Sequence, residues 1–372
     1  MGAESYGLYV FAMSIVTYFI SFVSFGFDFP AVKAIAQNQD DNNVKAHTLS
    51  CVLTAKIYIL IPSFLIFVSL IALVPGLSKH WEIYAILFGN VFVNILFPIW
   101  YFQGIQKMRL VTYIQLVFKL LSLPFIFWAI VGPADIWKFA LIITVSNLSG
   151  GLIAALMINY YERLHFRLMP YSELKKWYKD ALPFFWTSAV GVIKQQSIPV
   201  IIGVFFNMSN VAVYDLAYKI FSVPNILFGS INGALFPKIA IDNNKNVIKK
   251  VLRLEMLAGF LVIFTVIVLG RWIVIILGGL EMLGAYPIAV VMSFGVLTFL
   301  LVGGYISFIF VPQNRYYLIT KNQILAFFIF FIFTAVGLLI WKNILVIAIA
   351  WSLAGLFEIL YCNILIKKYK LF

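Results

Sequence analysis

Single lysines lie in the middle of long apolar runs: Lys119 within 110–131, Lys194 within 181–206 and Lys219 within 210–238. An ammonium group at the centre of a membrane costs about 2.5–3.5 kcal/mol on insertion scales, so it tends to face a water-filled cavity or a partner. A cavity lined by ammonium groups attracts anions, and lysine binds phosphate as a point charge. The three lysines therefore predict a binding site for an anionic group such as a diphosphate.

Other polar and aromatic residues of the apolar runs could complete such a site. Asn90 and Gln195 offer amides, and Trp100, Tyr101 and Trp186 offer aromatic rings on which a ligand could stack. Asp215 precedes Lys219 by one helical turn, so these two side chains can pair on one helix face. Each residue also has a structural reading: Lys219 could simply neutralise Asp215, Lys119 could extend to an interface, and the amides could join helices.

The sequence shows no pattern of residues typical of a catalytic or metal-binding site. Cys51 and Cys362 fall in separate apolar runs, and the three histidines show no metal-ligand spacing. The connections on the predicted outer face are too short for a catalytic domain. We therefore expect no enzyme activity, no metal and no cofactor.

The composition explains why these residues belong to membrane helices. Of 372 residues, 63% are hydrophobic and only 11% are charged, and a soluble domain could not cover that much apolar surface. The fold class is therefore an all-α polytopic membrane protein. The predicted spans are 7–29, 48–74, 81–102, 110–131, 136–159, 181–206, 210–238, 251–278, 285–311, 320–341 and 343–364.

A basic, polar run at 159–180 divides the chain. We predict an N-terminal helical half at 1–160 with five spans, a cytoplasmic basic linker at 161–180, and a C-terminal half at 181–372 with six spans. The two bundles would enclose a central cavity, as in transporters built from two repeated halves. The net charge of +13 fits cytoplasmic loops better than nucleic-acid binding. Lysine and arginine are concentrated in alternate connections, which places the N-terminus outside and the C-terminus inside the membrane.

Several blocks resemble the Wzx family of O-antigen flippases, which belongs to the MATE-like polysaccharide-transport superfamily. The most specific is PIWYFQGIQKM at 98–108, and weaker matches are ESYGLYVFA at 4–12, FGFDFPAVKAIAQ at 25–37 and ALFPKIA at 234–240. The resemblance implies twelve helices in two six-helix halves, cytoplasmic termini and a cationic cavity. Lys119 stands where the family often has a basic residue. The family's first helix is missing here, so that the chain would start in the first periplasmic loop.

The resemblance implies a flippase that moves undecaprenyl-diphosphate-linked oligosaccharide repeat units, of O-antigen or capsule, by alternating access. Its partners would be this lipid-linked saccharide, the bilayer, a coupling proton or sodium ion, and other polysaccharide-assembly proteins. One alternative is a MATE-type antiporter of small cations, which needs a deep carboxylate in the first half; Asp28 is the only acid near such a place. A second alternative is an inactive, N-terminally truncated fragment.

Overall fold

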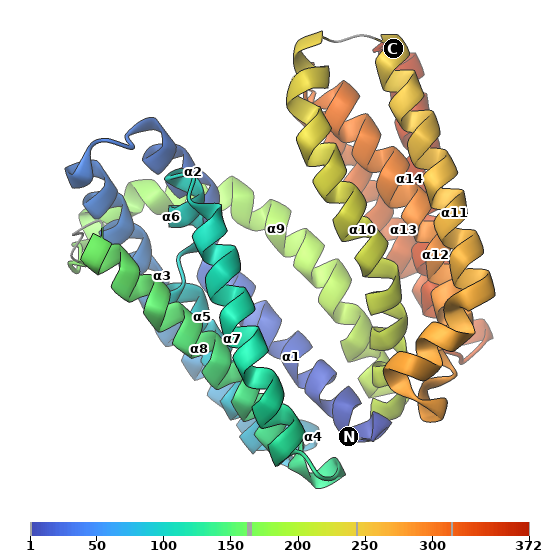
Figure 1. Ribbon diagram of the computed structural model, residues 1–372, viewed down its shortest axis with the longest axis horizontal. Coiled ribbons are helices and arrows are strands. Elements are labelled where there is room, and N and C mark those ends of the chain that lie inside the picture. Colours follow the sequence, from blue (N-terminus) through green and yellow to red (C-terminus); the bar gives the residue numbers. More distant parts are fainter. Residues whose placement is uncertain (1, 162–165, 243–244, 314, 372) are drawn as a thin grey trace. The chain divides into compact units, whose positions relative to one another are not determined.

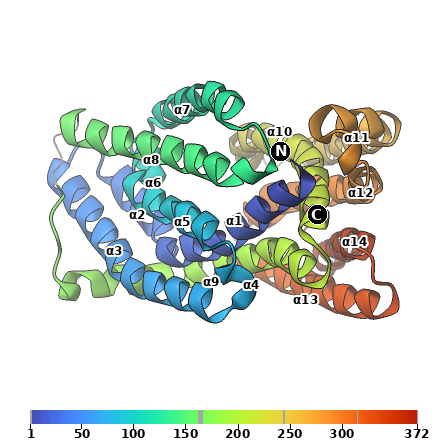
Figure 2. The same cartoon turned by 90° about the horizontal axis from the view of Figure 1, so that it is seen from below.

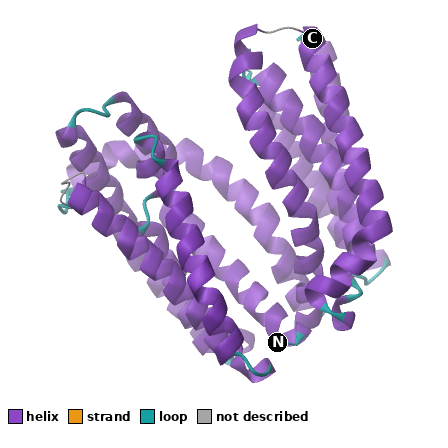
Figure 3. Cartoon of the chain, viewed as in Figure 1, coloured by secondary structure: helices purple, strands orange, loops and turns teal. Residues whose placement is uncertain are grey.

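The computed structural model describes residues 2–161, 166–242, 245–313 and 315–371. Within these ranges the regular structure is entirely helical, with no strand (Figure 3). The described residues contain 11 helices that are long and apolar enough to cross a membrane, and each predicted span corresponds to one of them. The all-α polytopic prediction is confirmed.

The chain forms two compact units, residues Met1–Ile201 and Ile202–Phe372. In the first unit, α5 packs against α1 and α8, α7 packs against α8, and the short α2 packs against α3 and α6 (Figures 1 and 2). Its elements are α1 (Ala3–Ser24), α2 (Asp28–Gln37), α3 (Asn42–Leu73), α4 (Pro75–Ser78), α5 (Trp81–Leu96), α6 (Ile99–Gly104), α7 (Met108–Ala129), η1 (Pro133–Asp135), α8 (Ile136–Tyr161) and most of α9 (Tyr171–Phe205).

In the second unit, α12 is the central helix and contacts α10, α11 and α14, while α13 packs against α14. The elements are α10 (Met208–Asp242), α11 (Lys245–Gly278), η2 (Leu280–Met282), α12 (Ala285–Tyr305), the π-helical η3 (Ile306–Phe310), α13 (Tyr316–Ile340) and α14 (Leu345–Lys368). Phe308, Phe310, Leu318 and Cys362 belong to its buried apolar cluster.

The first predicted span, 7–29, is too long at its end, because the chain turns sharply after α1. Phe25 adopts a left-handed conformation with φ of 46°, and Gly26 follows with φ of 72°. A Cβ atom on Gly26 would lie 2.6 Å from the backbone nitrogen of Phe185 in α9, so only glycine fits this close approach. The turn thus brings α9 against the end of α1, where the rings of Phe25 and Phe185 stack with centroids 4.7 Å apart.

The predicted linker 161–180 is helical in its second half. Residues 162–165 lie outside the described residues, 166–170 have no regular secondary structure, and α9 begins at Tyr171. Tyr178 of α9 donates a hydrogen bond to the carbonyl of Ala55 in α3 at 3.1 Å. Contacts of this kind assign most of α9 to the first unit, so the compact units divide at residue 201 and not within 161–180. The proposal that 1–160 and 181–372 are repeated halves stays a prediction.

Candidate functional site

The first unit contains a cavity of about 360 Å³ between α1, α5, α7 and α8. Its polar lining comes from three helices: Asn90 and Asn94 from α5, Gln115 and Lys119 from α7, and Ser146 and Asn147 from α8. The pairs on α5 and α7 are each four residues apart, a spacing that places both side chains on one helix face. Two of the residues predicted from the sequence, Asn90 and Lys119, therefore line the same cavity.

A chain of amide hydrogen bonds holds one wall of the cavity. The Asn90 side-chain nitrogen donates to the Thr144 hydroxyl at 3.0 Å and to the Leu87 carbonyl at 2.9 Å. Asn147 in turn donates to the Asn90 side-chain oxygen at 2.9 Å. Asn90 is buried, so its amide is fixed between α5 and α8 instead of moving with solvent. Such fixed polar groups present a rigid surface to a ligand.

An ion pair between a buried lysine and a partly exposed carboxylate, which the sequence analysis missed, supports the same wall. Lys56 of α3 is 1% exposed, and its ammonium donates to the Asp28 carboxylate at 3.0 Å and to the Asn94 side-chain oxygen at 3.2 Å. Because Asn94 lines the cavity, the network connects α2 and α3 to the site. The sequence does show that Lys56 interrupts a long apolar run, as the three predicted lysines do. Its partners could not be predicted, because they lie 28 and 38 residues away.

The charge of the cavity follows from these contacts. Asp28, the one carboxylate that a cation antiporter could have used, is neutralised by Lys56. Lys119 is exposed to the cavity, and within the described ranges no carboxylate lies within ion-pair distance of it. The cavity therefore presents one positive charge among amides.

The remaining predicted site residues lie on α9 and α10. Lys194, Gln195 and Trp186 belong to α9, and Trp186 is 63% exposed. On α10, Lys219 and Asp215 pair at 3.0 Å, which confirms the pairing expected from their spacing. Whether Lys194 and Lys219 share a chamber with Lys119 stays a prediction.

The block PIWYFQG has a structural role that the sequence did not reveal. It forms α6, in which Trp100 and Tyr101 are only 3% and 0% exposed. Gly104 packs so closely on Ile35 of α2 that a Cβ atom would lie 2.6 Å from that side chain. The expectation that a ligand stacks on Trp100 and Tyr101 is therefore wrong for this structure, because both rings are buried.

This chain is similar to known proteins in sequence and in fold. A protein called "Putative O-antigen transporter" from Escherichia coli (strain K12) is 24% identical over 259 residues, which cover 68% of this chain and 61% of the relative. The chain thus spans less than two thirds of that relative's length.

Among solved structures, an inward-facing multidrug resistance MATE family transporter of the MOP superfamily superposes with a TM-score of 0.64 at 14% identity, over 99% of this chain and 92% of the other. The lipid II flippase MurJ, in an inward closed conformation, gives 0.60 at 16% identity, over 98% and 85%.

These structural matches confirm the MATE-like fold expected from the sequence. The family model described as "Polysaccharide biosynthesis protein" matches residues 1–241, the part of the chain that contains the cavity and the PIWYFQG block. The expected family resemblance is thereby confirmed: the chain is a multi-pass membrane protein and belongs to the polysaccharide biosynthesis protein family.

Proposed function

We propose that this protein is a flippase that moves a polyprenyl-diphosphate-linked oligosaccharide, an O-antigen or capsule repeat unit, across the bacterial inner membrane by alternating access. The observation that carries the proposal is the position of Lys119 in an amide-lined cavity without a neighbouring carboxylate among the described residues. The family and the name of the Escherichia coli relative support it.

The chemistry of the cavity suits such a substrate. The Lys119 ammonium would attract the diphosphate, and charge-assisted hydrogen bonds of this kind are worth about 1.5–3 kcal/mol. Asn90, Asn94 and Asn147 could exchange hydrogen bonds with sugar hydroxyls, while the prenyl tail stays in the lipid. No covalent bond is made or broken in this transfer, so the proposal requires no catalytic residue and no cofactor.

Residues of α9 and α10 would extend the path. Lys194, Gln195 and Trp186 offer a cation, an amide and an exposed ring, and the Asp215–Lys219 pair offers a second ammonium. We propose that they contact the saccharide or the diphosphate during the cycle. A proton or sodium gradient would drive the cycle, and other polysaccharide-assembly proteins would deliver and remove the substrate.

A cation antiporter of the MATE type is the second candidate, because the fold alone fits both functions. Such a transporter trades a cation for protons or sodium at a carboxylate. The ion pair of Asp28 with the buried Lys56 opposes this role in the first unit.

The test is complementation of a bacterial strain that lacks its own repeat-unit flippase. Lys119→Glu should lower surface polysaccharide by more than about tenfold, since a charge-assisted contact of about 1.5–3 kcal/mol becomes a repulsion. Lys119→Arg should keep most of the activity because the charge is retained. Lys342→Glu, an exposed residue between α13 and α14, is the matched control and should have no effect.

Two outcomes would contradict the proposal. Normal surface polysaccharide in Lys119→Glu would remove the cavity from the mechanism. Resistance to cationic drugs, conferred by the wild-type protein in a strain whose polysaccharide it does not restore, would favour the antiporter.

Charge reversal at both Lys194 and Lys219 tests the extended path separately and should also abolish surface polysaccharide.

A further inference from the structure

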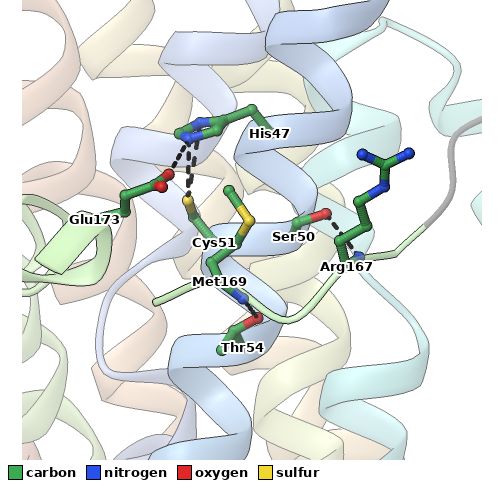
Figure 4. A network of polar contacts seen from close by, with 7 residues as sticks. All are labelled: His47, Ser50, Cys51, Thr54, Arg167, Met169 and Glu173. Carbon is green, nitrogen blue, oxygen red and sulfur yellow. Dashed lines mark hydrogen bonds and ion pairs between the residues drawn. The ribbon is translucent and has the colours of Figure 1, made fainter. Parts of the chain in front are cut away.

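His47, Cys51 and Glu173 form a compact cluster where α9 begins on the surface of α3 (Figure 4). The His47 Nε2 atom lies 2.6 Å from a Glu173 carboxylate oxygen and 3.7 Å from the Cys51 sulfur. The three potential ligand atoms all lie within 4.8 Å of one another. The sequence analysis treated Cys51 and the histidines as isolated, although His47 and Cys51 are one turn apart on α3.

The ligand set matches one class of ion. A thiolate, a neutral imidazole and a carboxylate are the side chains that bind Zn²⁺, whereas Mg²⁺ and Ca²⁺ select oxygen ligands only. With the thiol deprotonated, the thiolate and carboxylate together carry the charge that a divalent cation neutralises. We propose that His47, Cys51 and Glu173 bind a thiophilic divalent cation of the zinc class, which fastens the beginning of α9 to α3.

The distances fit a tetrahedral ion after a small adjustment. Zinc–sulfur and zinc–nitrogen bonds of about 2.3 and 2.0–2.1 Å imply a sulfur–nitrogen separation of roughly 3.5 Å. The Cys51 sulfur lies 3.7 Å from Nε2 and 3.8 Å from Nδ1 of His47. The ring has only to turn so that one lone pair faces the ion, and the His47–Glu173 separation widens as the ion replaces the proton between them.

The backbone around the cluster is already held in place without a metal. Figure 4 shows the segment before α9 running along α3, where the Arg167 amide donates to the Ser50 hydroxyl at 3.1 Å and the Met169 amide donates to the Thr54 hydroxyl at 3.3 Å. Leu174, next to Glu173, is fully buried. Binding would therefore cost little ordering of the chain, which favours affinity.

Access and coordination number also agree with a metal site. The His47 and Glu173 side chains are 51% and 42% exposed, so an ion can arrive from water and keep water as its fourth ligand. A nucleophile–base–carboxylate triad would use the same residue types. That role is unsuitable here because Cys51 is completely buried and offers no room for an attacked substrate.

The test uses the full-length protein, purified in detergent without a polyhistidine tag and titrated with Co²⁺ and then Zn²⁺. We expect about one Co²⁺ per chain, with a thiolate-to-cobalt charge-transfer band that Zn²⁺ removes and Mg²⁺ does not. Cys51→Ser should lose the band. His47→Gln and Glu173→Gln should weaken binding by more than about tenfold, since losing even an outer partner of a metal ligand costs 10- to 100-fold.

The chain provides matched controls for each ligand. Cys362→Ser, His80→Gln and Glu82→Gln should bind Co²⁺ as the wild type does. Because His47 and Glu173 are exposed, their variants decide the question even if Cys51→Ser fails to fold. Zn²⁺ should also raise the thermal unfolding midpoint of the wild type and of the controls, but not of the ligand variants. No charge-transfer band in the wild type, or unchanged affinity in His47→Gln and Glu173→Gln, would overturn the proposal.

Discussion

The two units use polar side chains in different ways. In the first unit, polar partners come from different helices: Lys56 of α3 binds Asp28 of α2 and Asn94 of α5, and Asn90 of α5 binds Thr144 of α8. In the second unit, the Asp215–Lys219 pair lies within one helix. Its helices are joined by hydrogen bonds as well, such as the one from the Tyr305 hydroxyl of α12 to the Asn363 side-chain oxygen of α14 at 3.1 Å. They are also closely packed: Gly355 of α14 lies so near Thr298 of α12 that a Cβ atom would not fit.

The difference indicates how each unit is stabilised. Between membrane helices there is little hydrophobic driving force, so packing of small residues and interhelical hydrogen bonds must hold them together. In the second unit, a buried apolar cluster accompanies the interhelical hydrogen bonds. Interhelical hydrogen bonds also leave a polar wall, which the cavity of the first unit requires.

The largest expected effect comes from the Lys56–Asp28 ion pair. Asp28→Asn leaves the buried Lys56 ammonium without its counter-charge, and because Asp28 itself is 43% exposed we expect a cost of about 3 kcal/mol, the low end for breaking a buried pair. Asp215→Asn is the matched variant in the second unit. It should cost less than about 1 kcal/mol, because Lys219 is 57% exposed and pairs within one helix. Thermal unfolding midpoints in detergent compare the two.

A double variant separates charge from packing. Lys56→Met has a similar volume and needs no counter-charge, so adding it to Asp28→Asn should recover most of the lost stability. Equal losses in Asp28→Asn and Asp215→Asn would show that the two pairs are equivalent. That result would remove the contrast between the units.

Two glycines with nearly equal φ allow a second comparison. Gly26 in the first unit and Gly279 in the second have φ of 72° and 73°. An added Cβ atom on Gly26 would lie 2.6 Å from the Phe185 backbone, whereas nothing lies within 4 Å at Gly279. Gly279 has ψ of −176°, a conformation essentially restricted to glycine, so Gly279→Ala should cost about 1–3 kcal/mol from backbone strain alone. Gly26→Ala should cost about 2–4 kcal/mol, because the added Cβ atom also collides with the Phe185 backbone. Similar unfolding midpoints for the two variants would mean that α9 does not constrain the α1–α2 turn.

Local features of the sequence were enough to predict the helices and one ion pair. Apolar runs of about twenty residues identify membrane helices because hydrocarbon requires them. The Asp215–Lys219 pair was predictable because a four-residue spacing has the same geometry in every α-helix. The family could be recognised from PIWYFQG, although the reason for that block, packing of α6 on α2, could not.

Contacts between distant segments were not predictable. Lys56 and Asp28 are 28 residues apart, and His47 and Glu173 are 126 apart, so no periodicity connects them. The same limit explains the error on Trp100 and Tyr101, whose burial no spacing in the sequence indicates. Hydropathy places a residue within a helix, but the partner helix decides whether its side chain is buried, paired or exposed to a cavity.

The smallest expected effects concern two buried asparagines, and they should have opposite signs. Asn90→Leu removes the hydrogen bonds to Thr144 and Asn147, which should cost about 1 kcal/mol on the scale measured for membrane helices. Both side-chain polar atoms of Asn322, on α13 in the second unit, are buried without a hydrogen-bond partner in the described part of the chain. Asn322→Leu should therefore be neutral or stabilise by up to about 1 kcal/mol, since it removes an unsatisfied amide. Unfolding midpoints of the two variants measure the signs, and destabilisation by Asn322→Leu as large as that by Asn90→Leu would show that the Asn322 amide makes a stabilising contact.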